Sequence, residues 1–201
     1  MTKHESARHV RLFYAVELPQ DVRASAAAHA ASLRAAATQT IRASWEREEK
    51  LHITLKFVGE VAPEMTEKLT AAAARAAAAA RTFELRLSGA GVFPAPSRPQ
   101  VLWLGMEDEG GRLSELQRRV EEESVRAGAR PDARPFHAHV TVARLRASGR
   151  DERELARRHF DLGFAPLGFR VREIVLMRSE LGPRGSTYTP VSRHEFKERE
   201  Q

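Results

Sequence analysis

Two short segments of this chain share one pattern of side chains, and they constrain its fold more than any other feature. Residues 52–55 are His-Ile-Thr-Leu, and residues 139–142 are His-Val-Thr-Val. Side chains alternate between the two faces of a β-strand, so each segment predicts a strand with a histidine and a threonine on one face and two apolar residues on the other. The two segments begin 87 residues apart, which indicates a symmetric site that is built from two strands.

The repetition exceeds what composition alone produces. The chain has eight histidines and ten threonines in 201 residues. A His-x-Thr triplet is then expected about 0.4 times by chance, and about 0.07 times when both alternate positions must be apolar. One such segment is compatible with an ordinary core or surface histidine, whereas two indicate a shared functional site.

The rest of the chain mixes predicted strands and helices. We predict strands over residues 11–18, 51–59, 82–87, 100–105, 136–145, 169–178 and 188–196, and helices over residues 21–38, 63–81, 112–127 and 151–159. The segment 89–99, rich in Pro and Gly, predicts a turn. This order favours an α+β fold in which mainly antiparallel sheets flank a central cleft and the helices lie outside. We expect residues 1–201 to form a single domain of two pseudo-symmetric lobes, each with one motif strand.

Composition narrows the classes of protein that this chain can belong to. It has no cysteine, which excludes disulfides, thiolate nucleophiles and cysteine-bound zinc. No segment approaches the roughly 18 apolar residues of a membrane span, and the first residues do not resemble a signal peptide. We therefore expect a cytoplasmic protein without a membrane partner. We also expect it to be a monomer. The net charge of +6 suits a phosphate-bearing partner, although arginine-rich and alanine-rich usage can also reflect genome composition.

The paired motifs suit displacement at phosphorus. An imidazole titrates near pH 6.5, so one histidine can accept a proton while the other donates one. The entering and departing oxygens lie on opposite sides of phosphorus, and one histidine cannot reach both. We expect His52 and His139 to be catalytic, and Thr54 and Thr141 to donate hydrogen bonds to non-bridging phosphate oxygens. A strained cyclic phosphodiester is a suitable substrate, and this scheme requires no metal and no cofactor.

Neighbouring residues are further candidates for binding substrate. By alternation, Lys56 and His137 share the faces of their motif histidines, where each either contacts the substrate or lies on solvated surface. A metal site at His137 and its neighbouring histidine lacks a third ligand nearby. Phe57 and Tyr188 are candidates for stacking on a base, with core packing the favoured prediction for Phe57.

Two further expectations concern basic side chains. By strict alternation, Arg144 faces away from His139. The five histidines outside the motif segments have no pattern around them and are predicted to lie at the surface: His4, His9, His29, His159 and His194.

Taken together, the motif segments resemble the 2H phosphoesterases, and among them the RNA 2′,3′-cyclic phosphodiesterases, also called 2′-5′ RNA ligases. The similarity extends over nearly the whole chain and includes residues 11–19, 51–59, 93–94, 98–105, 136–144, 179–181 and 185–188. The resemblance implies that His52 protonates the leaving oxygen, that His139 activates water, and that the product carries a terminal 2′-phosphate. It also implies an anionic contact for Arg144, beside the alternative of a structural ion pair.

The chain departs from the family pattern at three positions. Ala138 replaces a usual proline, His137 a common arginine, and Gln100 a frequent basic residue. These differences bear on nucleotide affinity and substrate range more than on the central chemistry.

The resulting prediction is an enzyme that hydrolyses the 2′,3′-cyclic phosphate ends of RNA. The same site could join RNA ends through a 2′-5′ linkage or act on a small cyclic nucleotide, but the equilibrium in water favours hydrolysis over ligation. A non-catalytic RNA-binding module is the alternative from another class. It is disfavoured because a binding module needs no paired acid and base.

Overall fold

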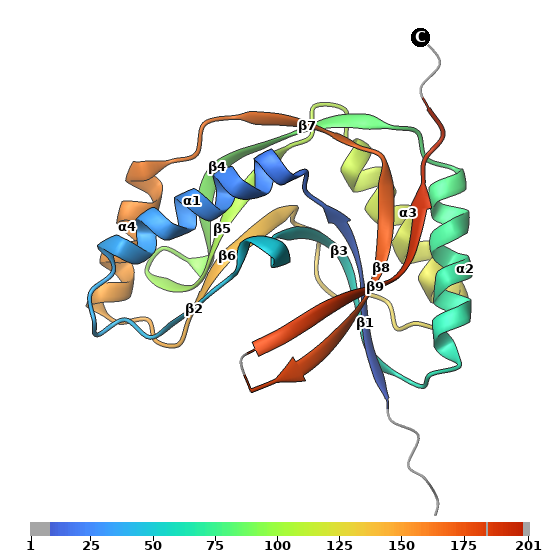
Figure 1. Ribbon diagram of the computed structural model, residues 1–201, viewed down its shortest axis with the longest axis horizontal. Helices are drawn as coiled ribbons and strands as arrows, with labels where there is room; N and C mark the ends of the chain where they lie inside the picture. The colour runs from blue at the N-terminus through green and yellow to red at the C-terminus, as the bar shows by residue number, and fades with distance from the viewer. Residues whose placement is uncertain (1–8, 184, 199–201) are drawn as a thin grey trace, which may run out of the picture.

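The computed structural model describes residues 9–183 and 185–198, which form two antiparallel sheets with helices packed on them (Figure 1). The first sheet has the strand order β3 (His52–Val61), β1 (Val10–Glu17), β8 (Glu173–Gly182) and β9 (Gly185–Glu195). The second has the order β2 (Ala43–Trp45), β6 (His139–Leu145), β5 (Arg98–Glu107), β4 (Phe83–Ala95) and β7 (Leu167–Val171). The helices are α1 (Gln20–Ala36), α2 (Met65–Ala78), α3 (Arg112–Arg126) and α4 (Arg150–Leu162), with a 3-10 turn at Glu48–Lys50. This arrangement confirms the predicted α+β class.

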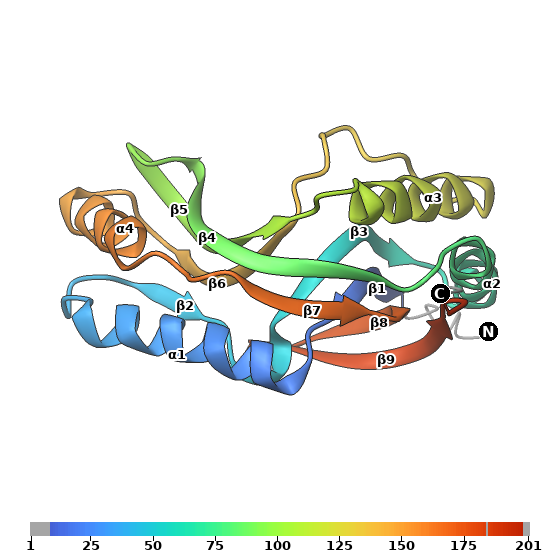
Figure 2. The same cartoon turned by 90° about the horizontal axis from the view of Figure 1, so that it is seen from above.

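The two sheets have corresponding strand orders. The order β3-β1-β8-β9 in the first sheet matches β6-β5-β4-β7 in the second, so the two motif strands, β3 and β6, occupy equivalent positions. The helices are exchanged between the sheets: α1, which follows β1, packs beside α4 and β6, whereas α3, which follows β5, packs beside α2 and β3. Figure 2 shows α1 with α4 at one end of the molecule and α2 with α3 at the other. Each sheet is therefore covered by helices from both halves of the chain.

The apolar positions of the motif strands lie in a core that contacts both sheets. Ile53, Leu55, Val140 and Val142 are all 2% exposed or less. Complete burial of a side chain of this size stabilises the fold by about 1.5–3 kcal/mol. The alternation that the two segments predict is therefore present in both strands, with the apolar side chains inside and the motif histidines on the opposite face.

Two predicted elements need correction. The predicted strand 169–178 is two strands, β7 and β8, which belong to different sheets and are separated at Arg172. Apolar residues are buried on both sides of this break, so the apolar pattern of the sequence continues through it without interruption. The predicted turn 89–99 is mostly strand, with turn residues only at 96–97. Gly91 is needed there for close packing, because a Cβ at this position would lie 2.2 Å from the ring of Trp103.

The expectation that all five other histidines lie at the surface is wrong for two of them. His159 is completely buried and His29 is 7% exposed, and their rings are joined by a hydrogen bond of 2.9 Å between Nε2 of His29 and Nδ1 of His159. The pair connects α1 to α4. His4 lies outside the described residues.

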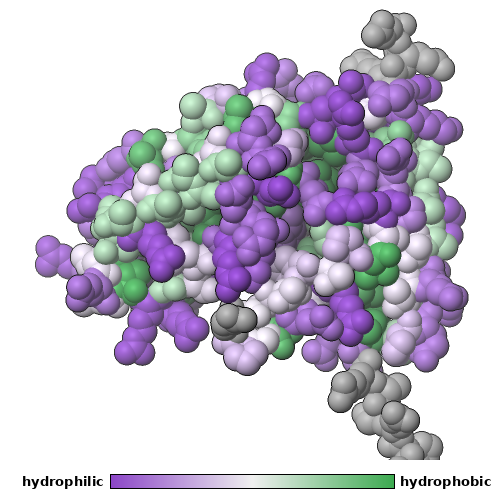
Figure 3. All heavy atoms as spheres, viewed as in Figure 1, coloured by the Kyte–Doolittle hydropathy of each residue, from purple (hydrophilic) through white to green (hydrophobic). Residues whose placement is uncertain are grey.

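None of the helices in the described ranges is both long and apolar enough to cross a membrane. Hydrophilic residues predominate on the face shown in Figure 3, and the apolar ones are scattered among them.

Candidate active site

The two motif strands contact each other although they belong to different sheets. Their four motif side chains, His52, Thr54, His139 and Thr141, line one small cleft. Five other residues complete its lining: Glu46, Lys50, Phe57, Arg144 and Tyr188. The structure therefore brings together the four residues that the sequence pattern selected as the centre of a site.

A larger hollow lies elsewhere, with a volume of about 450 Å³. Its charged lining includes three arginines and four glutamates, and it contains no histidine. The motif cleft is the better candidate for acid–base chemistry, because two histidines line it and none lines the larger hollow.

The two motif strands share a β-bulge at the same place. In the pairing of β1 with β3, Ala15 lies opposite Thr54 and Tyr14 opposite Lys56, so Leu55 is an extra residue. In the pairing of β5 with β6, the residue after Thr141 is likewise extra. A bulge shifts the alternation of side chains beyond it. Both strands therefore have the same order of exposure: the residue four positions after the histidine is buried, and the residue five positions after it is exposed.

This bulge overturns two predictions that were based on strict alternation. Lys56 does not share the face of His52: its side chain is completely buried and forms an ion pair with Glu121 of α3. Arg144 does not face away from His139, because it lies on the same face and lines the cleft. Phe57, the counterpart of Arg144 in the first motif, is 60% exposed and lines the cleft too, so the expectation that it packs in the core is also wrong.

Backbone carbonyls fix the orientation of both motif histidines. Nδ1 of His52 lies 2.6 Å from the carbonyl oxygen of Lys50, and Nδ1 of His139 lies 2.7 Å from that of His137. A carbonyl oxygen can only accept, so each Nδ1 must carry the proton. Each Nε2 is then the nitrogen that can exchange a proton, and that of His52 lies 2.9 Å from Oγ1 of Thr54.

Burial and neighbouring charges shift the titration of these groups. Burial lowers the pKa of His52, opposed by the hydrogen bond to the Lys50 carbonyl and by Glu17. Burial also lowers the pKa of His139, opposed by its bond to the His137 carbonyl. The charge of Arg144 lowers the pKa of both imidazoles further. In the free protein, both histidines are therefore mostly neutral at pH 7.

Aromatic rings hold the two imidazoles in place. His52 packs against Phe13 and against the edge of Tyr188, with ring centroids 5.1 and 5.4 Å apart. His139 lies 5.0 Å from the ring of Phe93. The contacts restrict the rotation of both imidazoles, as an acid–base pair requires.

His137 lies beside the cleft and is not part of its lining. Its ring is 4.8 Å from that of Trp103 and 6.3 Å from that of His139, and the residue is exposed. Within the ranges 9–183 and 185–198, no cluster of three or more His, Cys, Asp or Glu residues could hold a metal ion.

The sequence interpretation missed Glu46 and Lys50. Glu46 lies 3.8 Å from Arg144, and burial raises the pKa of its carboxyl group, opposed by Arg144 and Lys50. The ammonium of Lys50 donates to the carbonyl of Ser186 and lies 5.9 Å from the centre of the Tyr188 ring. Both residues belong to a charged run, residues 46–50, that has the composition of an exposed loop, so no sequence signal distinguished them.

Comparisons with known proteins find relatives that match most of the chain. The family model of the 2'-5' RNA ligase superfamily matches residues 19–183. The RNA 2',3'-cyclic phosphodiesterase of Methanothermobacter thermautotrophicus is 35% identical over 181 residues, which are 90% of this chain and 95% of the relative. The protein of the same name from Thermus thermophilus is 36% identical over 188 residues, which are 90% of this chain and 87% of that relative.

Solved structures are similar over almost the whole chain. The crystal structure of E. coli LigT complexed with 3'-AMP has a TM-score of 0.72 and 29% identity, and covers 94% of this chain and 98% of that one. The structure of TT0787 of Thermus thermophilus has a TM-score of 0.73 and 30% identity, and covers 94% of this chain and all of that one. The paired motifs, the sheet arrangement and the extent of the family match lead to one conclusion: this chain belongs to the 2'-5' RNA ligase superfamily.

Proposed function

We propose that this protein hydrolyses 2′,3′-cyclic phosphate ends of RNA to 2′-phosphomonoesters, with His52 and His139 as a metal-independent acid–base pair. The observation that carries the proposal is the presence of two imidazoles on strands of opposite sheets, each with Nδ1 bound to a carbonyl, in one cleft. The names of the relatives support the substrate class. The complex of LigT with 3'-AMP supports a nucleotide as the ligand, because that protein has a similar fold.

In the proposed reaction, Nε2 of His139 takes a proton from water as its oxygen attacks phosphorus. The bond between phosphorus and the 3′ oxygen breaks, and Nε2 of His52 gives its proton to that oxygen. The phosphate remains on the 2′ oxygen, and one water molecule is consumed. Proton transfer by a positioned side chain typically contributes a rate factor of about 10² to 10⁴.

Side chains that line the cleft together with the two histidines hold the phosphate. The hydroxyls of Thr54 and Thr141 donate to its non-bridging oxygens, where negative charge gathers in the transition state. Arg144, held by Glu46, supplies a positive charge at the same face of the cleft. Lys56 has no part in this contact, because its ammonium is paired with Glu121 on the buried side of β3.

The lowered pKa values fit the two roles differently. A neutral His139 is ready to act as a base near pH 7. His52 must hold a proton, and the negative phosphodiester raises its pKa when the substrate binds beside it, because an opposite charge favours the imidazolium. Glu17 acts in the same direction.

The base of the terminal nucleotide is expected to stack on Phe57. This ring lines the cleft, is 60% exposed and lies 5.9 Å from the ring of Phe13. Unstacked bases of single-stranded RNA are commonly recognised by aromatic rings. His137 lies beside the cleft, and its proposed partner is a phosphate or ribose of the substrate.

We also propose that the two lobes form one domain and that the protein acts as a cytoplasmic monomer. The exchange of helices between the sheets supports the single domain, because each sheet needs helices from both halves of the chain.

Turnover of a 2′,3′-cyclic nucleotide, and of an RNA oligonucleotide with a cyclic end, tests the proposed function. We expect both to be hydrolysed in excess EDTA, with the product identified as a 2′-phosphate by ³¹P NMR. Activity that disappears on chelation and returns with a divalent ion would contradict the metal-independent scheme. Tight RNA binding without turnover would support a binding module instead.

A further inference from the structure

Lys56 is a charged residue in a buried position, and its burial needs an explanation. Its side chain is completely buried, one residue beyond the bulge that follows the first motif. The ammonium contacts Glu121, the carbonyl oxygen of Arg130 at 2.9 Å, and Asp132 at 3.7 Å. An apolar side chain of similar volume commonly stabilises a fold as well as a buried ion pair does. The charge therefore indicates a role beyond filling space.

All three partners of Lys56 belong to one part of the chain. Glu121 is on α3. Arg130 and Asp132 are in the segment 130–138, the later part of the connection from α3 to the second motif strand. The other oxygen of the Glu121 carboxylate accepts a hydrogen bond of 2.9 Å from the backbone N–H of Asp132. Glu121 thus links Lys56 to the loop.

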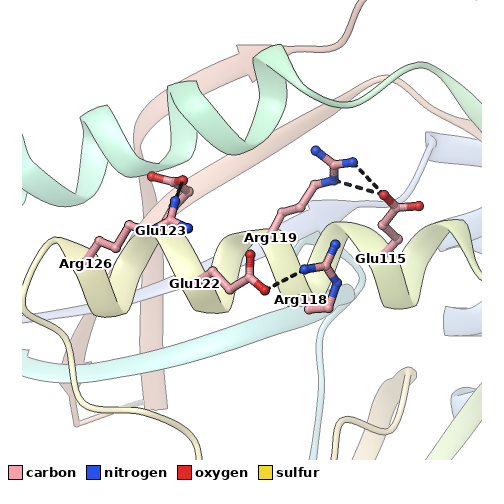
Figure 4. A network of polar contacts seen from close by, with 6 residues as sticks. All are labelled: Glu115, Arg118, Arg119, Glu122, Glu123 and Arg126. Carbon is pink, nitrogen blue, oxygen red and sulfur yellow. Dashed lines mark hydrogen bonds and ion pairs between the residues drawn. The ribbon is translucent and has the colours of Figure 1, made fainter.

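Glu121 contacts other elements than the neighbouring acids of α3 do. Figure 4 shows Glu115, Glu122 and Glu123 paired with arginines of the same helix, and Glu123 pairs with Arg75 of α2 as well. Exposed pairs within one helix contribute little to stability. Glu121 instead joins β3 to the loop that leads to the second motif strand.

The loop itself has few other polar anchors. Across residues 130–138, all of them described, no backbone group forms a turn or loop hydrogen bond to another backbone group. The polar anchors are Lys56 and Glu121 near its start and the bond from His139 to the His137 carbonyl at its end. The position of that carbonyl depends on the loop, and the carbonyl fixes the orientation of the His139 imidazole.

We infer that Lys56 is a positioning residue: with Glu121, it holds the 130–138 loop so that the His137 carbonyl orients His139 for proton transfer. The first motif strand thereby controls the geometry of the second motif histidine. This inference rests on the proposed function for its effect on turnover.

The test compares Lys56→Met with Lys68→Met, which removes an exposed lysine of α2. We expect Lys56→Met to lower kcat by about 10-fold to 100-fold with little change in KM, because a misplacement of about 1 Å can cost a factor of about 10². Exchange of the Asp132 amide, which donates to Glu121, should become faster. NMR titration should show a lower pKa for His139, because the carbonyl bond that raises it is weakened. The Lys68 variant should match the wild type in all of these measurements.

A second variant separates positioning from stability. Lys56→Met/Glu121→Met replaces both partners by apolar groups, which should restore much of any lost Tm. The loop still lacks its anchors, so kcat should stay low. Recovery of kcat together with Tm would overturn the inference, as would an unchanged His139 titration and unchanged exchange of the Asp132 amide in Lys56→Met. Exchange and titration require no substrate, so they test the loop even if the wild type fails to hydrolyse a cyclic phosphate.

Discussion

Acid should weaken this fold through the buried pair of His29 and His159. Nε2 of His159 lies 3.2 and 3.0 Å from the carbonyl oxygens of Gly91 and Trp103, so this nitrogen must carry the proton. Nδ1 of His159 then accepts from Nε2–H of His29. Protonation of His159 would place two donors face to face, and charging His29 would place a cation in a buried site beside Phe164.

The size of the effect follows from the pKa of His29. Burial, with a smaller contribution from His159, lowers this pKa from 6.5 to about 4. The unfolded chain therefore binds more protons than the folded protein between about pH 6.5 and 4, so the free energy of unfolding falls as the pH is lowered through that range. For a shift of this size, the loss is about 3 kcal/mol.

The assay is urea unfolding, followed by circular dichroism, at several values between pH 6.5 and 4. Gln at position 29 can still donate to His159 and does not titrate, so His29→Gln should lose about 3 kcal/mol less than the wild type over this range. The exposed His9 provides the matched control, and His9→Gln should follow the wild type. The same pH dependence in wild type and His29→Gln would refute the reasoning.

Three further predictions concern the cleft. Thr54→Val and Thr141→Val should each lower kcat, by up to about 10²-fold for a partly solvated site, while the Tm stays near that of the wild type; a changed Tm with an unchanged rate would instead show a structural role. Phe57→Ala should raise the KM for a cyclic nucleotide by roughly 5-fold to 150-fold, the factor that corresponds to about 1–3 kcal/mol of stacking, whereas Phe160→Ala, at an exposed ring of α4, should leave it unchanged. The profile of kcat/KM against pH should peak below pH 6.5, because it reports the lowered pKa values of the free protein. The alkaline limb of the kcat/KM profile should lie at lower pH than the alkaline limb of the kcat profile, because bound phosphate raises the pKa of His52. Coincident limbs would argue against such a rise.

The motif strands show how far the sequence predicts this site. The alternation of His52, Ile53, Thr54 and Leu55 reproduces the observed faces, because local sterics and burial set the period of a strand. The bulge follows from pairing with β1, which is distant in the sequence, so strict alternation predicts the wrong faces for Lys56 and Phe57.

Long-range contacts explain the other differences. His29 and His159 are 130 residues apart, and nothing next to either one indicates that it has a partner. The segment 169–178 divides between two sheets, because its apolar residues are buried in both. Such features depend on which elements meet, which the local pattern does not specify.

The most direct test of the central claim asks whether His52 and His139 have separate roles as acid and base. It uses His52→Ala and His139→Ala with two substrates: a 2′,3′-cyclic nucleotide, and the same molecule with sulfur in place of the 3′ oxygen. A thiolate with a pKa of about 8.5 leaves without a proton from an acid. On the oxygen substrate, each variant should lose about 10²-fold or more in turnover. On the sulfur substrate, His52→Ala should recover most of the wild-type rate, and His139→Ala should remain impaired. Equal losses of both variants on both substrates would contradict the division of roles. If either variant kept near-wild-type turnover on the oxygen substrate, the histidine that it replaces would have no part in the mechanism.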